Sequence, residues 1–314
     1  MEIIRGLEEL KEGYPNAVIT IGNFDGLHLG HQKIIQTVLR DSQDIRGTSM
    51  VVTFDPHPMK VLAPEREVKL LTTPKERERL VEAMGINVLL CITFDKAFSS
   101  LDPDEFIEDI LVKKINAKEV IVGQNYAFGK ARKGTTELLR RRGRKYGFRV
   151  KAVRHAKLNG EVVSSSKIRS FLSMGQVFEA SAFLGRAYTI EGNVIRGAGR
   201  GEKLLHVPTA NITTPNELVP REGVYAVRVG LRRSFFDGVA NIGKKPTFSD
   251  SVPSYEVHLF NFTGNLLGES LRIYFVDWIR NQQSFPDALS LEKQIRNDIE
   301  QAKDVLNRKK PTLI

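Results

Sequence analysis

The sequence predicts an α/β domain with a parallel sheet, followed by an antiparallel β-barrel that ends in a helix. Two observations lead to this expectation. Apolar strand-like runs alternate with amphipathic helical patterns in the first half, and strand-like runs follow one another without helices after about residue 185. A chain of 314 residues is also long for a single core. We therefore expect two domains, 1–185 and 186–314, joined by a short connection near residues 184–187.

The first half gives its elements in a regular order. A helical pattern built on Ile34, Ile35, Val38 and Leu39 follows the first strand, a charged helix is expected over 73–84, and a third helix begins near Pro103. The expected strands are 17–21, 50–54, 88–92, 120–123 and 148–153. The loops 22–31, 55–58 and 123–134 then follow strands. Since ligands of open parallel sheets bind beyond the carboxyl ends of the strands, these loops predict one binding site.

The second half reads as strands punctuated by Gly, Pro and Asn, which is typical of a barrel. The expected strands are 188–195, 223–229, 235–242, 255–260 and 271–275. A final amphipathic helix is expected to face the barrel with Leu291, Ile295, Ile299 and Ala302.

Composition excludes several classes of protein. Hydrophobic residues make up 41% and charged residues 27% of the chain, and no apolar run approaches the roughly 20 residues that span a bilayer. The first residues do not resemble a secretion signal. The single cysteine, Cys91, lies in an apolar run and excludes an internal disulfide. We expect a cytoplasmic protein without a membrane partner, and the sequence predicts no oligomeric state.

The net charge of +10 raises the question of nucleic-acid binding. The densest basic run is 140–145, with the sequence RRRGRK. Lysine and arginine are also common at solvated helix ends, where they complement the helix dipole. A basic surface equally suits small phosphorylated substrates, and we favour the solvated or small-phosphate interpretation over nucleic acid.

The segment 22–31, GNFDGLHLGH, lies between a strand and a helix. A helix start offers unpaired backbone N–H groups and a positive dipole end, which suit a phosphate. Gly22, Gly26 and Gly30 allow a polyanion to approach the backbone closely. His28 and His31 can share one face of the first turn. A metal half-site is disfavoured because no third ligand stands nearby at suitable spacing. We predict in-line nucleotidyl transfer at the α-phosphorus of ATP, with the imidazoles as donors to the phosphate, over a purely structural role.

Three further features are open to two interpretations. Asp25 either serves the site or stabilises its own turn. The run Asp55-Pro56-His57-Pro58 is either part of the site or a rigid exit from a strand. The hydroxyls of 163–169, VSSSKIR, are either ordinary helix N-caps or, with Lys167 and Arg169, a clamp for the β- and γ-phosphates.

The chain resembles the bacterial bifunctional riboflavin kinase/FAD synthetase family. The resemblance rests on the motifs GNFDGLHLGH (22–31), TFDPHP (53–58), VGQNYAFG (122–129) and SSSKIR (164–169). It implies that the first half is a Rossmann-like nucleotidyltransferase domain of the His-x-Gly-His type, which adenylylates FMN to FAD. It implies catalytic roles for His28 and His31. The ATP residues that it implies are Gly22, Phe24, Asp25, Gly26, Gly30, Ser164, Ser165, Ser166, Lys167 and Arg169. The flavin residues are Asp55, Pro56, His57, Pro58, Asn125 and Phe128.

The second half resembles the riboflavin kinase half of the same family. The supporting motifs are GRG (199–201), PTAN (208–211), GVYA (223–226), NIG (241–243) with PTF (246–248), and EVHL (256–259). The resemblance implies that Glu256 is the general base for the riboflavin 5′-hydroxyl. It implies that Thr209 and Asn211, whose hard oxygens share one side of an extended strand, hold Mg²⁺ with the ATP phosphates. It further places ATP at Gly199, Arg200, Gly201 and Lys203. The expected substrates are ATP, riboflavin and FMN.

Three departures from the family pattern keep alternatives open. His206-Val207 stands where a glycine-containing pair is usual, Gln282 replaces a glutamate, and Ser166-Lys167 replaces Thr-Arg. One alternative is therefore an FAD synthetase whose kinase is weakened. A second is an RNA-binding or regulatory protein that uses the 140–145 run. A third, a tRNA-aminoacylating enzyme, is disfavoured because the chain is short and lacks a Lys-Met-Ser-Lys-Ser loop.

Overall fold

The computed structural model describes residues 1–10, 14–196, 209–244 and 253–314. The described chain divides into two compact units, Met1–Val163 and Ser164–Ile314. Residues 164–185, which the sequence placed with the first domain, pack in the second unit as helices α7 (Ser165–Ser173) and α8 (Val177–Leu184). Gly175 between them has φ +80°, and a Cβ there would lie 2.2 Å from the Trp278 ring. A glycine is therefore needed where this helix turn meets the barrel.

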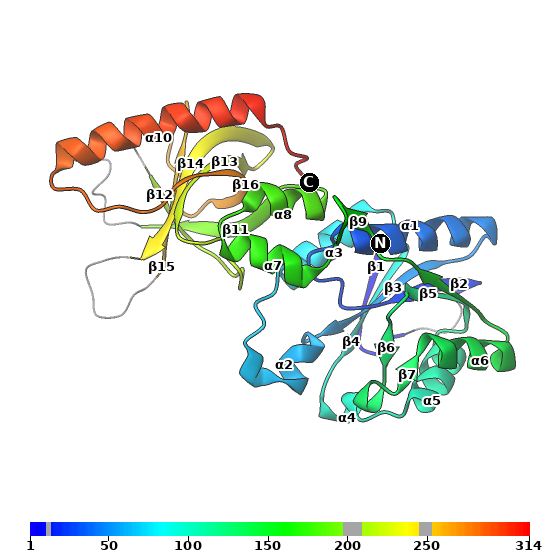
Figure 1. The fold of residues 1–314 in the computed structure, drawn as a ribbon. Helices are drawn as coiled ribbons and strands as arrows, with labels where there is room; N and C mark the ends of the chain where they lie inside the picture. The colour runs from blue at the N-terminus through cyan, green and yellow to red at the C-terminus, as the bar shows by residue number, and fades with distance from the viewer. Residues whose placement is uncertain (11–13, 197–208, 245–252) are drawn as a thin grey trace. The chain divides into compact units, whose positions relative to one another are not determined.

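The first unit is built on a six-stranded sheet in the order β1-β4-β3-β2-β5-β8, and every neighbouring pair is parallel (Figure 1). The parallel sheet was predicted, but its edge strand β1 was not. The strands are β1 (Glu2–Arg5), β2 (Ala17–Ile21), β3 (Ser49–Asp55), β4 (Val88–Thr93), β5 (Ala117–Gly123) and β8 (Arg149–Val153).

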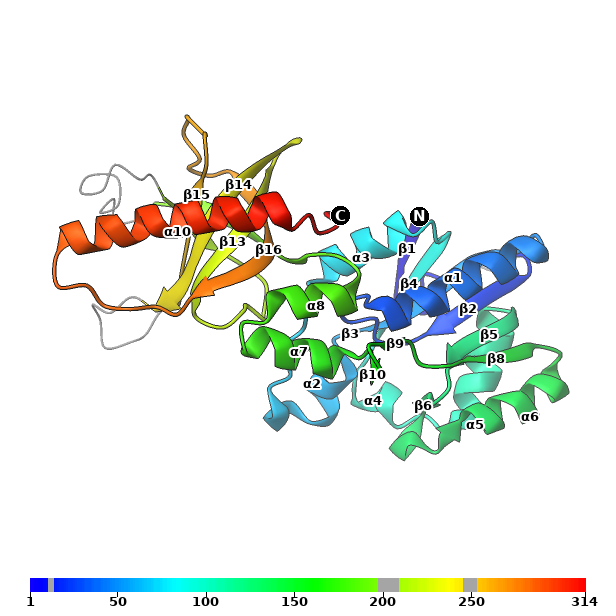
Figure 2. The ribbon, with the colours of Figure 1, turned by 45° about the horizontal axis from the view of Figure 1, so that its top comes forward.

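Two layers of helices cover this sheet, as strands buried on both faces require. Helices α1 (Leu29–Asp44) and α3 (Pro74–Ala83) pack with Val18, Val51 and Leu89 on one face. The alternate residues, such as Ile19 and Val52, pack on the other face with the π-helix η2 (Phe106–Lys114) and with α6 (Thr136–Tyr146). Figure 2 shows α1 and α3 on the opposite side of the strands from α5 (Pro103–Glu105) and α6.

Short elements fill the loops of the first unit. They are α2 (Pro58–Leu62), η1 (Pro64–Arg66), α4 (Lys96–Ser99), β6 (Ala127–Phe128), η3 (Lys130–Arg132), β7 (Gly134–Thr135), β9 (Lys157–Leu158) and β10 (Glu161–Val162). The loops 22–31, 55–58 and 123–134 follow β2, β3 and β5 directly, so the structure confirms that they leave the same edge of the sheet.

The second unit contains a closed barrel in the order β11-β12-β15-β14-β13-β16, with every neighbouring pair antiparallel. The predicted barrel is therefore confirmed. Its strands are β11 (Tyr188–Ile195), β12 (Ala210–Thr213), β13 (Gly223–Leu231), β14 (Ser234–Lys244), β15 (Pro253–Leu259) and β16 (Ser270–Arg280). Within the described ranges, no helix has both the length and the apolar character needed to cross a membrane.

The last helix, α10 (Ala288–Arg308), lies across the outside of β13, β14 and β16 (Figure 1). Ile299 and Ala302 pack there as predicted, together with Val305 and Leu306. Leu291 and Ile295 are half-buried. An ion pair adds to this packing, since Nε and Nη2 of Arg280 donate to the two oxygens of the Asp298 carboxylate at 2.8 and 2.7 Å. Only 4% of the Asp298 side chain is exposed.

We expect Asp298→Ala to lower the free energy of unfolding of the second unit by about 3–5 kcal/mol, because it leaves the Arg280 charge without its partner. Arg296→Ala on the same helix is the control. Its pair with Glu292 is largely exposed, so we expect a change of about 0–1 kcal/mol. Urea unfolding followed by Trp278 fluorescence measures both values. Equal small effects in the two variants would contradict the structural role of the Arg280–Asp298 pair.

Candidate active sites

The turn after β2 has an unusual backbone that buried side chains support. Phe24, Gly26 and Leu27 all have positive φ values, of 49°, 81° and 36°. Such values are unfavourable for residues other than glycine. Phe24 and Leu27 are both fully buried in the core beneath α1. Their burial stabilises the strained backbone and so fixes the path into the first turn of α1.

Asp25 supports this turn from within. Its Oδ1 accepts hydrogen bonds from the backbone N–H groups of Leu71 and Thr72, at 2.9 and 3.2 Å. The N–H of Gly26 donates to the Thr72 hydroxyl at 3.2 Å. Only 4% of Asp25 is exposed. These contacts support the interpretation of Asp25 as a residue that stabilises its own turn.

The two histidines stack at the start of α1. His28 is the N-cap, and its Nδ1 accepts the backbone N–H of His31 at 3.3 Å. The ring centroids are 3.7 Å apart and the planes differ by 14°. The His31 ring also meets the Phe24 ring edge-on at 5.2 Å. A Cβ on residue 30 would lie 3.1 Å from two His28 ring atoms, so Gly30 leaves the space that this stacking needs.

His31 is held in its neutral form. Burial lowers its pKa well below the ordinary value of 6.5, and the neighbouring His28 lowers it further. Its buried Nδ1 has no hydrogen-bond partner within the described chain. A neutral imidazole can donate a hydrogen bond without bringing a positive charge beside the stacked His28 ring.

The lowered pKa of His31 predicts a pH-dependent stability. The unfolded chain binds a proton at this residue near pH 6.5, whereas the folded chain binds it only at a lower pH. Between the two values the unfolded state holds more protons, so the free energy of unfolding rises with pH and falls as the solution is acidified below about pH 6.5. We expect a loss of about 1 kcal/mol per pH unit in this window.

The slope of the free energy of unfolding against pH is measured by urea unfolding at several pH values. Amide exchange in α1 serves as the probe that reports unfolding of the first unit. The variant His31→Gln should show a smaller slope, and His155→Gln, at an exposed histidine of the same unit, should show the wild-type slope. An unchanged slope in His31→Gln would contradict the burial of a neutral His31.

The loop after β3 is joined to the turn after β2. His57 caps α2, and its Nδ1 accepts the N–H of Met59 at 3.1 Å. A neutral imidazole that accepts at Nδ1 carries its proton on Nε2. The Nε2 atom lies 3.1 Å from Nδ2 of the Asn23 side-chain amide, and exchanging the oxygen and nitrogen of that amide lets its oxygen accept this proton. Asp55 and Pro56 are exposed beside this contact, and Pro58 is half-buried.

Aromatic side chains form a continuous cluster beside the same edge of the sheet. Phe128 stacks on Tyr126 with centroids 5.5 Å apart and packs on Phe106 at 5.4 Å. Burial raises the pKa of Tyr126, which keeps its hydroxyl protonated. The cluster continues through Phe98, Phe94 and Phe54. Sequence reasoning identified Phe128 but missed Phe94, which follows β4 directly, and Phe98, which lies in α4.

The hydroxyl run after Val163 begins a helix of the second unit. Ser164 is the N-cap of α7, and its hydroxyl accepts the N–H of Lys167 at 3.3 Å. The Lys167 ammonium lies 5.0 Å from the centroid of the Phe171 ring. Ser165 and Arg169 are half-buried, whereas Ser166 is exposed. The N-cap interpretation therefore holds for Ser164, and the phosphate role of the run remains a prediction.

In the barrel, strand register brings polar residues of three strands into one row. Asn211 of β12 and Asn241 of β14 stand directly opposite Glu256 of β15, one on each side. Directly opposite residues have Cβ atoms about 5 Å apart. The Ser254 hydroxyl lies 3.5 Å from a Glu256 carboxylate oxygen. This row faces away from the buried Ala210, Ala240 and Val257.

Gln282 contacts this row, because its amide donates to the Asn241 side-chain oxygen at 3.0 Å. Thr209 is exposed just before β12. No role was predicted for Asn241, since only the register between distant strands reveals its place beside Glu256. Gly199, Arg200, Gly201, Lys203, His206, Val207, Pro208 and the run 246–248 lie outside the described residues.

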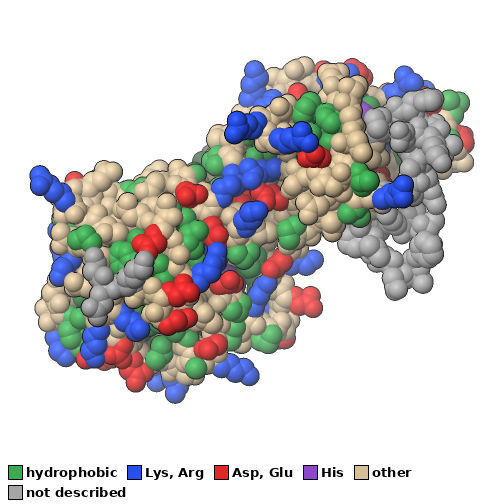
Figure 3. Space-filling model, turned by 180° about the vertical axis from the view of Figure 1, so that it is seen from behind, with side chains coloured by type: hydrophobic (Ala, Val, Ile, Leu, Met, Phe, Trp, Pro, Cys, Tyr) green, Lys and Arg blue, Asp and Glu red, His purple; other side chains and the backbone are tan. Residues whose placement is uncertain are grey.

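The basic run on α6 is partly neutralised. The Arg142 guanidinium donates to Asp104 at 2.7 Å, and this contact lowers the pKa of the Asp104 carboxyl. Arg140 lies 3.7 Å from Glu137. On the face seen in Figure 3, Lys and Arg side chains are interspersed with Asp and Glu. Ion pairs such as Arg142–Asp104 and Arg140–Glu137 are typical of a solvated helix surface. They agree with the solvated interpretation of the basic run.

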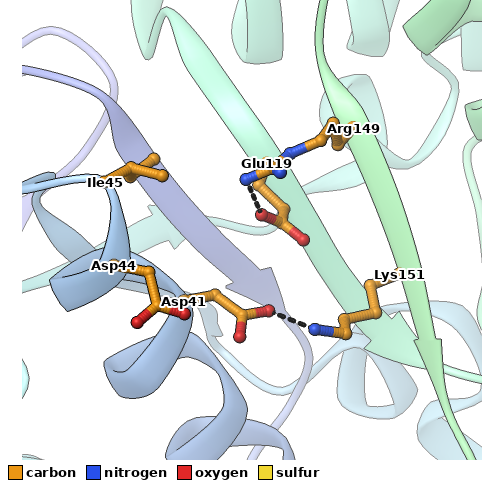
Figure 4. A pocket seen from close by; sticks show the side chains of 6 residues that line it. All are labelled: Asp41, Asp44, Ile45, Glu119, Arg149 and Lys151. Atoms are coloured by element: carbon orange, nitrogen blue, oxygen red, sulfur yellow. Dashed lines mark hydrogen bonds and ion pairs between the residues drawn. The ribbon is translucent and has the colours of Figure 1, made fainter.

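A small pocket of about 170 Å³ lies between the end of α1 and strands β5 and β8 (Figure 4). Four of its charged side chains form two ion pairs, Glu119 with Arg149 at 2.7 Å and Asp41 with Lys151 at 2.5 Å. Glu119 and Arg149 lie near the starts of their strands, at the opposite edge of the sheet from the loops 22–31 and 55–58. The pocket is thus separate from the candidate site.

Comparisons with known proteins assign both halves. The FAD synthetase family model matches residues 10–167, and the riboflavin kinase family model matches residues 184–306. A bifunctional riboflavin kinase/FMN adenylyltransferase of Buchnera aphidicola is 37% identical, over 95% of this chain and 96% of its own. The Escherichia coli protein of the same description is 34% identical over 99% and 100%. A solved structure described as a macrolide-efflux protein of Streptococcus pneumoniae is 29% identical, covers 97% of this chain and 99% of its own, and has a TM-score of 0.88.

Proposed function

This chain belongs to the bifunctional riboflavin kinase/FMN adenylyltransferase family, and we propose that its two reactions use two separate sets of residues. The enzyme phosphorylates riboflavin to FMN with ATP, and it transfers AMP from ATP to FMN to form FAD and pyrophosphate. We assign the second reaction to a domain of residues 1–185 and the first to a domain of residues 186–314. We place both in the cytoplasm, on composition and the single cysteine.

The stacked His28–His31 pair at the start of α1 is the observation that carries the adenylyl-transfer assignment. An FMN phosphate oxygen attacks the α-phosphorus of ATP, and pyrophosphate leaves from the opposite side. Negative charge builds up on the phosphate oxygens during this step. The backbone N–H groups of the helix start and the imidazole donors are already in place to stabilise it. No covalent intermediate with the protein is needed.

The FAD synthetase family model supports the assignment of the hydroxyl run to this half, because it extends to residue 167. We therefore retain Ser164, Ser165, Ser166, Lys167 and Arg169 as phosphate-binding residues. For the flavin we retain Asn125, Phe128 and the loop 55–58, which lie at the edge of the sheet lined by the aromatic cluster.

For the kinase half we propose that Glu256 accepts the proton of the riboflavin 5′-hydroxyl as that oxygen attacks the γ-phosphorus of ATP. Asn211 and Asn241 flank Glu256 on the two neighbouring strands. We also propose that Thr209 and Asn211 hold Mg²⁺. Their hydroxyl and amide oxygens are donors that Mg²⁺ prefers, and Asn211 stands next to Glu256 in the row. The ion would neutralise charge on the ATP phosphates.

Chromatographic separation of flavins tests the proposal. Incubation with riboflavin and MgATP should give FMN and then FAD, and incubation with FMN and MgATP should give FAD and pyrophosphate. Removal of Mg²⁺ with a chelator should stop FMN formation. If the protein forms FAD from FMN but forms no FMN from riboflavin, the result would favour an FAD synthetase with a weakened kinase. Gln282, which replaces a glutamate of the family pattern, is the reason to measure this outcome.

A further inference from the structure

Arg77 on α3 is a buried cation that the fold alone does not require. It is 6% exposed, and its Nε is buried without a hydrogen-bond partner. Among the described residues, no carboxylate lies within ion-pair distance of its guanidinium; its neighbour Glu78 pairs with Arg5. Burying an unpaired charge is unfavourable, whereas an apolar side chain of similar shape would pack there without that cost. The charge therefore calls for a functional explanation.

The Arg77 guanidinium joins the two loops of the adenylyl-transfer half. Its Nη1 donates to the carbonyl oxygen of Asn23 and to that of Phe54, both at 3.4 Å. Asn23 belongs to the turn that carries His28, and Phe54 immediately precedes the 55–58 loop. The Asn23 amide and His57 join the same two loops through their side chains. The loops are thus connected at two points, and Arg77 provides the connection between their backbones.

Helix α3 is well suited to hold this arginine in place. Thr73 caps the helix through a bond from the Glu76 N–H at 3.1 Å. The two residues before Thr73 provide the N–H groups that Asp25 accepts. The start of α3 therefore holds the turn at Asp25, and Arg77, one helical turn later, holds it at Asn23. The turn is thus held by the segment that leads into α3 and by the first turn of the helix itself.

We propose that Arg77 is a positioning residue for adenylyl transfer, which fixes the turn bearing His28 relative to the 55–58 loop. The inference rests on the proposed function, in which one loop serves ATP and the other serves FMN. In-line transfer requires the FMN phosphate and the α-phosphorus to meet at a defined distance. A displacement of about 1 Å between such elements costs on the order of 100-fold in rate.

Two variants test the proposal, Arg77→Met and Arg77→Lys, with Lys75→Met as the matched control. Lys75 is an exposed cation on the same helix. We expect Arg77→Met to lower kcat for FAD formation from FMN by about 10–100-fold, with a smaller change in KM for ATP and unchanged FMN formation from riboflavin. Arg77→Lys should fall between Arg77→Met and wild type, because the ammonium of the shorter lysine side chain reaches the two carbonyl oxygens less well than Nη1 of the guanidinium does. Lys75→Met should match wild type.

A purely structural role predicts a different result, namely a lower unfolding midpoint with wild-type kcat in the folded fraction. Wild-type kcat for FAD formation in either folded variant would overturn the proposal, as would an equal loss of FMN and FAD formation. If Arg77→Met does not fold, the kcat of Arg77→Lys decides. Failure of the proposed function is a separate result, since the wild-type protein would then make no FAD from FMN and MgATP.

Discussion

Replacing His28 with alanine should abolish FAD formation from FMN while FMN formation from riboflavin continues at the wild-type rate. The imidazole caps α1 through the His31 N–H and stacks on the His31 ring, so its loss removes one donor and releases the other. Removing a single donor to a developing oxyanion typically costs about 100–1,000-fold in kcat. We expect a loss of at least that size here, because two donors are affected.

The His28→Ala measurement uses both flavin conversions on the same preparation, followed by chromatography. His155→Ala replaces an exposed histidine of the same unit and should retain both activities. Unfolding curves establish that the variant is folded. Loss of FMN formation in folded His28→Ala would contradict the assignment of the two reactions to separate residues.

Replacing Glu256 with glutamine should have the opposite effect, abolishing FMN formation from riboflavin and sparing FAD formation from supplied FMN. The substitution keeps the size of the side chain but removes the ability to accept a proton. General-base contributions are typically about 100–10,000-fold. The flanking Asn211 and Asn241 are neutral amides and cannot take over this role.

The control for Glu256→Gln is Glu300→Gln, which makes the same change at an exposed position of α10. It should retain both rates. Initial rates of FMN formation at saturating riboflavin and MgATP measure the loss in kcat. A decrease of less than about tenfold in folded Glu256→Gln would contradict its role as general base.

Local patterns predicted most of the fold because buried elements repeat apolar residues at characteristic spacings. Strands such as 88–92 are continuous apolar runs, as a sheet covered on both faces requires. Strand β1 escaped prediction because only Ile4 of its four residues is buried, so it lacks that pattern. Similarly, the helix expected near Pro103 continues as the π-helix η2, a change in hydrogen bonding that hydrophobic spacing does not encode.

The candidate sites were predicted only in part, for a related reason. The His28–His31 pair is local, since two residues three apart on a helix share a face. The partners of Asp25 lie 46 and 47 residues along the chain, and those of Arg77 lie on two other loops. Likewise, the row formed by Asn211, Glu256 and Asn241 depends on strand register. No local pattern in the sequence specifies such long-range contacts.

We propose that two independent sets of residues act in sequence, and a mixture of the two inactive variants tests this claim. His28→Ala and Glu256→Gln are each incubated with riboflavin and MgATP, first alone and then together. We predict that His28→Ala alone stops at FMN, that Glu256→Gln alone leaves riboflavin unchanged, and that the mixture forms FAD. A mixture of the two folded variants that forms no FAD would contradict the claim.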